Sequence, residues 1–330
     1  MNSKANTLMT VSELLPKTAP PEPVALPSLP AQPLVSIVVP SFKQGRFIRD
    51  TIDSILQQSY RPLTIHVIDG NSPDDTVEVL KSYGDIPELQ WVSEPDRGVV
   101  HAVNKGFAQV TGDIVAIQSS DDVYLPETIA KIVETFRKNP DCGLLYGDSV
   151  KVDADGRELL RQDTAPYTLE NLLTMRTWIP QPSAFFRREM LDACGGWDES
   201  IPYSPDTDLW LRMAFRTHVI KHDDFLSARR MHDEQRDTQK AKIVRDYTQM
   251  IRQSPDIAAA STKLQRAAQI GCEVIQVRYA NTSWEQMQHK WRLRQLSPEQ
   301  MPLQSVIKSG LQPIRDVLSK IKRRLVGRST

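Results

Sequence analysis

The stretch Ile114-Val-Ala-Ile-Gln-Ser-Ser-Asp-Asp122 decides how the rest of this chain is interpreted. Residues 114–117 are apolar and β-prone and are followed by small polar residues, a pattern typical of a buried strand in a parallel sheet. In open α/β sheets the ligand site lies beyond the carboxyl ends of such strands. Asp121 and Asp122 stand at that end with no basic neighbour close in sequence, so their charges would repel each other. A divalent cation, Mg²⁺ or Mn²⁺, would relieve that repulsion and share its ligands with substrate phosphates. Alternatively, the two acids only stabilise the start of a helix near Pro126, and this stretch alone does not separate the two interpretations.

The composition is that of a globular protein. The chain has 330 residues, of which 40% are hydrophobic and 25% charged, enough for one large domain or two ordinary ones. Its 41 basic and 41 acidic residues balance, so no overall field points to nucleic acid as a partner. Three widely spaced cysteines suit a reducing compartment. With no apolar run of transmembrane length and no signal-peptide core, a cytoplasmic location is expected.

Strand and helix patterns alternate along the first half of the chain. Strands are expected over residues 34–39, 63–68, 89–93 and 114–117, each followed by a helical pattern. This alternation predicts βαβ units and an α/β fold with a mostly parallel central sheet flanked by helices. Residues 1–33, which carry seven prolines, are expected to form a flexible arm. Three parts therefore follow: this arm, a core domain over residues 34–232, and a mostly helical extension over residues 233–330.

The ends of the four strands bring candidate binding residues to one edge of the predicted sheet. They are Pro40 and Phe42, Asp69, Asp96 and Arg97, and Asp121 and Asp122. An aromatic ring, an arginine and several carboxylates suit a nucleotide diphosphate with its metal. Because no GxGxxG fingerprint and no P-loop follows any of these strands, NAD-binding and simple ATPase functions lack their motifs.

Five ordered blocks between residues 35 and 212 resemble the inverting family 2 glycosyltransferases of the GT-A fold. They are VVPSF at 38–42, DGNSPDDT at 69–76, SEPDRG at 93–98 with NKG at 104–106, SSDD at 119–122, and an acceptor-side block. The last combines PSAFFRR at 182–188, GGWDE at 195–199 and DTDLWLR at 206–212. Because an ordered set is much more specific than any one block, the chain is identified as a member of this family.

The resemblance implies a role for each matching residue. Pro40 and Phe42 would form the floor under the nucleotide base, Asp69 would bind base or ribose, and Arg97 would hold the nucleotide. Asp121 would contact the ribose, Asp122 would hold the metal, and Asp206 would be the catalytic base. Two departures matter: Ser120 occupies the place of the first acid of a DxD motif, and Pro205 replaces the first acid of a Glu-Asp pair. Asp208 is therefore the fallback base.

The segment Arg229-Arg-Met-His232 resembles a further family element. It implies His232 as a second metal ligand or as a donor to the leaving phosphate, with a structural role equally open. The implied activity is transfer of a sugar from a nucleotide-diphosphate sugar, first of all a UDP-sugar, to a glycan or lipid-linked acceptor in bacterial surface polysaccharide or glycolipid synthesis. The alternative is an inactive GT-A module that only binds a nucleotide sugar or glycan. A nucleotidyltransferase is a further alternative, but the Gly-rich loop with Lys or Arg that would bind its triphosphate does not follow the first strand of this chain.

The end of the chain combines apolar residues at helical spacing with a basic face. Residues 306–328 include Lys320, Lys322, Arg323, Arg324 and Arg328. This combination is typical of a helix lying on an anionic membrane surface and also of a helix packed on the domain. A peripheral contact with the inner face of the membrane is therefore one expectation for this segment.

Overall fold

The computed structural model describes residues 21–233, 239–299 and 301–302. They fall into two compact units. The first, here called the sheet unit, contains residues 22–172 and 176–247. The second, called the helical unit, contains residues 173–175 and the described residues from 248 onward. The helices α6 (Leu169–Leu173) and α9 (Lys240–Gln253) have residues in both units.

The sheet unit is built on one sheet whose described strands run in the order β3-β2-β1-β4-β8-β6-β9-β5, with β7 paired to β6. The strands are β1 (Val35–Ser41), β2 (Leu63–Asp69), β3 (Leu89–Ser93), β4 (Ile114–Ile117), β5 (Val123–Tyr124), β6 (Cys142–Val152), β7 (Glu158–Leu160), β8 (Ala184–Arg187) and β9 (His218–Arg230). The run β3-β2-β1-β4 is parallel, as the alternation predicts. The pairs β4–β8, β8–β6, β6–β7 and β5–β9 are antiparallel. The long pair β6–β9 is parallel as well, so most paired residues of the described sheet lie in parallel pairs. The α/β class is therefore confirmed, and the antiparallel pairs begin at β4, where the βαβ alternation ends.

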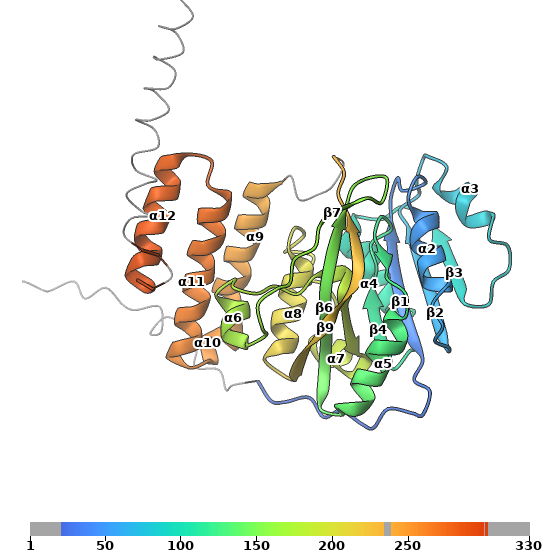
Figure 1. Cartoon of the computed structure of the whole chain (residues 1–330), viewed down its shortest axis with the longest axis horizontal. Helices are drawn as coiled ribbons and strands as arrows, with labels where there is room; N and C mark the ends of the chain where they lie inside the picture. Colours follow the sequence, from blue (N-terminus) through green and yellow to red (C-terminus); the bar gives the residue numbers. More distant parts are fainter. Residues whose placement is uncertain (1–20, 234–238, 300, 303–330) are drawn as a thin grey trace, which may run out of the picture. The chain divides into compact units, whose positions relative to one another are not determined.

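Helices cover both faces of the sheet (Figure 1). They are α2 (Ile48–Leu56), α3 (Thr76–Lys81), α4 (Val99–Phe107), α5 (Thr128–Lys138), α7 (Arg188–Cys194) and α8 (Pro205–Ala214). Alternate residues of β1 face α2 and α5 through a core that includes Val35, Ile37, Ile52 and Phe136. Each such side chain stabilises the fold by roughly 1.5–3 kcal/mol on burial.

On the other face of the sheet, α4 and α8 pack through aromatic rings. Phe186 of β8 contacts Trp210 of α8, with ring centroids 5.6 Å apart, and Phe107 of α4 at 6.0 Å. A Cβ on Gly106 would lie only 2.3 Å from Val38 Cγ1, so a glycine lets α4 approach β1 closely. This packing fixes the strand whose end carries Phe42.

Residues 22–33 belong to the sheet unit although they form no helix or strand. Val24 N donates to Arg216 O (2.9 Å), and Arg187 Nη2 donates to Pro27 O (2.7 Å). The expectation of one flexible arm over residues 1–33 therefore needs correction for this part, because a backbone hydrogen bond and one from the Arg187 side chain hold it. Residues 1–20 lie outside the described residues.

The helical unit contains the end of α9 with α10 (Pro255–Ala259), α11 (Thr262–Tyr279) and α12 (Ser283–Leu296). Hydroxyl side chains cap three of these starts: Ser254 accepts from Ile257 N, Ser261 from Leu264 N and Thr282 from Glu285 N. Such caps satisfy backbone donors that have no partner inside the helix. The described part of the C-terminal region is thus helical, as predicted. No described helix has the length and apolar character needed to cross a bilayer. The basic segment 306–328 lies outside the described residues.

Candidate active site

The loops that follow β1, β2, β3 and β4 meet at one edge of the sheet. Strand register places Ser41 beside Asp69, and Asp69 beside Ser93. The parallel direction of these strands brings their carboxyl ends together, which is where α/β sheets bind ligands. The structure therefore gathers the predicted residues of the first three loops.

Asp69 is fully buried and organises the loop that follows β2. Its Oδ1 accepts a hydrogen bond from Ser72 Oγ (2.5 Å), and its Oδ2 accepts from Ser72 N (3.0 Å) and Ser93 Oγ (2.6 Å). Asn71, inside this turn, has a positive φ of 62°. In this structure Asp69 therefore shapes the loop, and its carboxylate is covered by its own neighbours.

An aromatic ring, bare backbone and a carboxylate form a continuous surface beside Asp69. Phe42 is 52% exposed. A Cβ on Gly70 would lie 2.7 Å from Asp96 Oδ2 and 3.3 Å from the Phe42 ring, so any side chain there would fill the surface. Pro40 is buried inside β1 opposite Ile68 and does not contribute an exposed floor. Of the two residues predicted to form the floor under the base, only Phe42 is exposed and able to stack on it.

Arg97 lies on the exposed rim of this region. Its Nη2 forms an ion pair with Glu199 Oε1 at 2.7 Å, and both side chains are more than half exposed. Glu199 comes from the GGWDE block, so the pair joins a donor-side block to an acceptor-side block. An exposed pair of this kind contributes about 0–1 kcal/mol to stability, which leaves Arg97 able to exchange partners.

The acidic pair after β4 meets the segment that follows β9. Asp121 Oδ2 lies 3.0 Å from His232 Nε2, and both side chains are largely buried. Asp122 Oδ1 accepts a hydrogen bond from Arg230 N (2.8 Å). Burial, and then the charge of Asp121, raise the pKa of the Asp122 carboxyl well above its usual value. The sequence prediction joined His232 to Asp122, whereas the structure joins it to Asp121.

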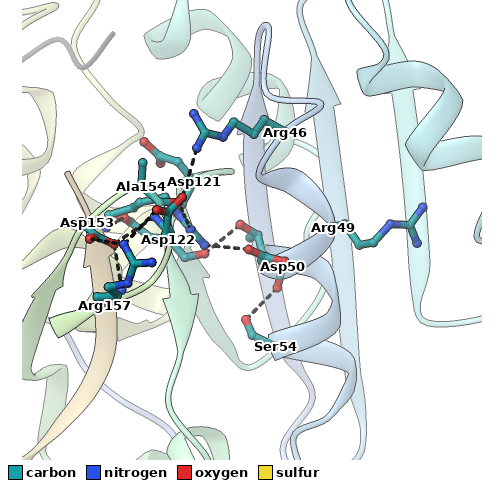
Figure 2. Close-up of polar contacts among 12 residues, drawn as sticks. Arg46, Arg49, Asp50, Ser54, Asp121, Asp122, Asp153, Ala154 and Arg157 are labelled. Atoms are coloured by element: carbon teal, nitrogen blue, oxygen red, sulfur yellow. Dashed lines mark hydrogen bonds and ion pairs between the residues drawn. The ribbon is translucent and has the colours of Figure 1, made fainter. Parts of the chain in front are cut away.

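Arg230 is the centre of this arrangement. Its side chain donates to Asp50 Oδ2 (2.8 Å), Asp121 O (2.9 Å) and Ala154 O (2.7 Å), and it is 6% exposed. We call these four residues the Arg230 network; Figure 2 shows Asp50, Asp121 and Ala154 converging from three parts of the chain. The Arg230 guanidinium also lies 4.8 Å from the centre of the Phe47 ring. The Phe47 ring in turn contacts the His232 ring, with centroids 4.9 Å apart.

Sequence reasoning missed the Arg230 network. The motif Arg229-Arg-Met-His232 drew attention to His232 only. Arg230 in the same motif was the one feature of the sequence that could have indicated the network. Asp50 gave none, because an acid in the first turn of a helix is explained by the helix dipole alone.

The residues at this edge fit a divalent cation that completes its ligands with substrate oxygens. Among the described residues, no three His, Cys, Asp or Glu side chains converge as a closed metal site. The Asp121–His232 contact offers an oxygen and a nitrogen, and Asp122 adds a buried carboxyl whose pKa is raised by burial and by the charge of Asp121. Mg²⁺ is commonly held by one or two carboxylates together with phosphates. The chemistry of the set therefore suits an ion that arrives with a diphosphate.

The two candidate bases occupy different environments in the first turn of α8. Asp206 is half-buried. Asp208 is buried, and its Oδ2 accepts from Arg212 Nε (2.8 Å) and Nη2 (2.7 Å). Arg212 also donates to Cys194 O and Gly196 O, so Asp208 holds the turn after α7. The two acids therefore differ in that Asp208 is buried in an ion pair with Arg212, whereas Asp206 is the more exposed of the two.

Comparison with known proteins relates this chain to glycosyltransferases. Residues 36–195 match the family described as "Glycosyl transferase family 2". An uncharacterized glycosyltransferase of Rickettsia felis is 28% identical over 213 residues, which covers 62% of this chain and 35% of that protein. The hyaluronan synthase of Pasteurella multocida is 27% identical over 184 residues, covering 55% of this chain and 19% of the synthase. The chain thus spans about a third or less of these two relatives.

Solved structures share the fold. S. aureus TarS in complex with UDP-GlcNAc superposes with a TM-score of 0.60 at 16% identity, covering 81% of this chain and 82% of that chain. The mannosyltransferase PcManGT from Pyrobaculum calidifontis, in complex with GDP-Man and Mn²⁺, gives a TM-score of 0.58 at 21% identity and covers 91% and 84%. At these identities the similarity establishes the fold.

Proposed function

Because this chain carries a glycosyl transferase family 2 domain over residues 36–195, we propose that it transfers a sugar from a nucleotide-diphosphate sugar to an acceptor hydroxyl with inversion. The observation that carries the proposal is the meeting of Asp121, Asp122 and His232 at the carboxyl edge of the parallel strands. The acceptor is a glycan or a lipid-linked sugar, as in bacterial surface polysaccharide or glycolipid synthesis. The similarity to a hyaluronan synthase supports a polysaccharide product.

The donor nucleotide would bind along the first three loops. Its base would stack on the exposed Phe42 ring and meet the Asp96 carboxylate across Gly70. Arg97 would leave its exposed pair with Glu199 to hold the nucleotide. A UDP-sugar is the first candidate, since TarS is described with UDP-GlcNAc. GDP-sugars come second, since PcManGT is described with GDP-Man.

The diphosphate would lie beside the acidic pair. Asp122 and His232, with Asp121, would hold a Mn²⁺ or Mg²⁺ ion, which as a Lewis acid stabilises the charge of the leaving diphosphate. The buried Asp122 carboxyl needs such a positive partner because burial and Asp121 both oppose its ionised form. Arg230 would keep Asp121 and Asp122 in place through its bonds to both residues.

Asp206 would take the proton from the acceptor hydroxyl as the new bond forms. General-base assistance contributes roughly 10²- to 10⁴-fold in rate. Asp206→Asn should therefore reduce turnover by that order and leave donor affinity unchanged. Asp208→Asn is the matched control from the same helical turn; its effect should be a lower melting temperature from the lost Arg212 contact.

The test is release of nucleoside diphosphate from UDP-, dTDP- and GDP-sugars with Mn²⁺, Mg²⁺ or EDTA. We expect slow metal-dependent hydrolysis of one donor, with loss of activity in Asp122→Ala and Asp206→Asn. Calorimetry of the same samples should show weaker metal-dependent nucleotide binding in Asp122→Ala only. Donor binding without any turnover, with or without sugar acceptors, would instead identify an inactive module that only binds the nucleotide sugar.

A further inference from the structure

A buried carboxylate on α9 holds the loop that leads into the proposed base. Tyr203 N donates to Asp246 Oδ2 at 2.7 Å. Asp246 is completely buried, and its other oxygen, Oδ1, accepts from Arg245 Nε (2.8 Å) and Nη2 (2.6 Å). Both carboxylate oxygens are therefore used, and one of them is used on a backbone amide 43 residues away in sequence.

The same helix also holds the side chain of Tyr203. Lys242 Nζ donates to Tyr203 Oη (2.8 Å) and lies 4.8 Å from the centre of its ring. Lys242 and Asp246 are four residues apart, so they lie one turn apart on the same side of α9. Two adjacent side chains of α9 thus fix the backbone and the ring of one residue.

The position of Tyr203 controls how the chain enters α8. Ser204 is the residue before the helix, Pro205 is its first residue, and Asp206 follows in the first turn. Since proline fixes its own φ and restricts the residue before it, the path set at Tyr203 passes directly into the first turn. A shift of the Tyr203 amide would therefore move the start of α8 and the Asp206 carboxylate with it.

Losing the Asp246 contact would leave the Tyr203 amide without its partner beside a buried group. A backbone donor that has lost its acceptor in a partly buried place is unfavourable, so the loop would rearrange to find another partner. The region matched by the family ends at residue 195, so Asp246 belongs to the part of the chain outside that match.

We propose that Asp246 is a positioning residue for the transfer reaction: through the Tyr203 amide it sets the place of Asp206 at the acceptor side. This rests on the proposed function, in which Asp206 is the base. The donor residues Phe42, Asp96 and Asp121 lie on other loops, so loss of Asp246 should lower turnover without changing nucleotide affinity.

The experiment compares three full-length variants. Asp246→Leu removes the acceptor for Tyr203 N, while Asp246→Asn keeps one side-chain oxygen for it. Arg245→Gln removes the ion pair from the same carboxylate but keeps the Tyr203 bond, so it controls for lost stability. We would measure UDP-GlcNAc and GDP-Man hydrolysis with Mn²⁺, calorimetric affinity for UDP and GDP with Mn²⁺, and amide hydrogen exchange of residues 198–204.

We expect Asp246→Leu to exchange faster over residues 198–204 and to lose about ten- to a hundredfold in kcat, at unchanged nucleotide affinity. Asp246→Asn should recover most of that rate, and Arg245→Gln should match the unaltered protein in kcat even if its melting temperature falls. Unchanged exchange in Asp246→Leu would overturn the proposal, and so would faster exchange with full kcat or equal losses in all three variants. Failure of the proposed function would give a different result. The unaltered protein would then hydrolyse neither donor, while the exchange measurement would still show whether Asp246 holds the Tyr203 amide.

Discussion

Replacing Arg230 by methionine should weaken both the fold and the metal-dependent binding of nucleotide. The change removes three side-chain hydrogen bonds, to Asp50, Asp121 O and Ala154 O, but keeps the backbone bond from residue 230 to Asp122. Asp50 is 56% exposed, so its ion pair contributes little. The two carbonyls lose charged donors at about 1.5–3 kcal/mol each, so we expect the free energy of unfolding to fall by about 3–6 kcal/mol.

The binding effect has a separate cause. The Arg230 charge favours the ionised form of Asp122, which is the form that a metal needs, and its side chain fixes the backbone of Asp121. Residues that orient metal ligands commonly contribute 10- to 100-fold to metal affinity, so we expect a loss of that order for UDP with Mn²⁺. Urea unfolding measures the first effect, and calorimetry with and without EDTA measures the second.

Arg46 provides the matched control for this prediction. Its guanidinium also lies over the Phe47 ring, at 4.9 Å, but its side chain is 66% exposed and its pair with Asp155 is long, at 3.5 Å. Arg46→Met should change the free energy of unfolding by no more than about 0.5 kcal/mol. If Arg230→Met behaved like Arg46→Met in both assays, the buried Arg230 network would not hold the acidic loop and the reasoning would be refuted.

Two further predictions concern the sheet unit. Gly106→Ala should lower the free energy of unfolding by about 1–3 kcal/mol despite the better helix propensity of alanine, because its Cβ would meet Val38 in the core; urea unfolding with a stability equal to that of the unaltered protein would contradict the close approach. For Asp74, burial would raise the pKa, but hydrogen bonds from Thr76 and Gly45 outweigh it, so the pKa is lowered. A lowered folded pKa stabilises the protein above the unfolded value of about 3.9 and loses that contribution as the pH falls through the folded value. Asp74→Ala should therefore be less stable than the unaltered protein at pH 7, and the melting temperatures should converge in more acidic buffer; a difference that stayed constant with pH would exclude this origin.

Short apolar runs predicted the strands they could specify. Residues 89–93 and 114–117 are strands with the predicted bounds. A run of four or five mostly apolar residues between polar ones is too short for a typical helix and fits a buried strand. The 13-residue strand β9 gave a weaker signal, because only part of it is buried and it carries His, Lys and Asp. Strand direction was not readable either, since periodicity reports which residues are buried and not which neighbour they pair with.

The candidate site, like the fold, was predictable only in part. The acids at 121 and 122 were predictable because a strand end determines where they lie. Their partners were not readable from local spacing: His232, which only the family resemblance placed at the metal, is 111 residues from Asp121, and Asp50 is 180 residues from Arg230. Such pairs depend on how distant segments meet, which local spacing does not encode. Asp246 belongs to no motif, and only its burial and its bond to Tyr203 reveal it.

Two amide side chains explain how the donor and acceptor halves of the sheet unit stay aligned. Gln181 donates to Ile117 O (2.6 Å) and accepts from Ser119 Oγ (2.9 Å), which ties the acceptor side to the loop that carries Asp121. Asn104 donates to Trp197 O and accepts from Trp197 N, both at 2.8 Å. A side-chain amide that uses both its groups on one short segment fixes that segment in two directions. The acidic loop and the GGWDE turn are thus each held by a bidentate contact, while Tyr203 depends on α9. The place of the proposed base is therefore set from α9 through Tyr203. Changes at Asp246 should act on transfer rather than on donor binding, whereas changes at Arg230, which holds the acidic loop, should also weaken donor binding.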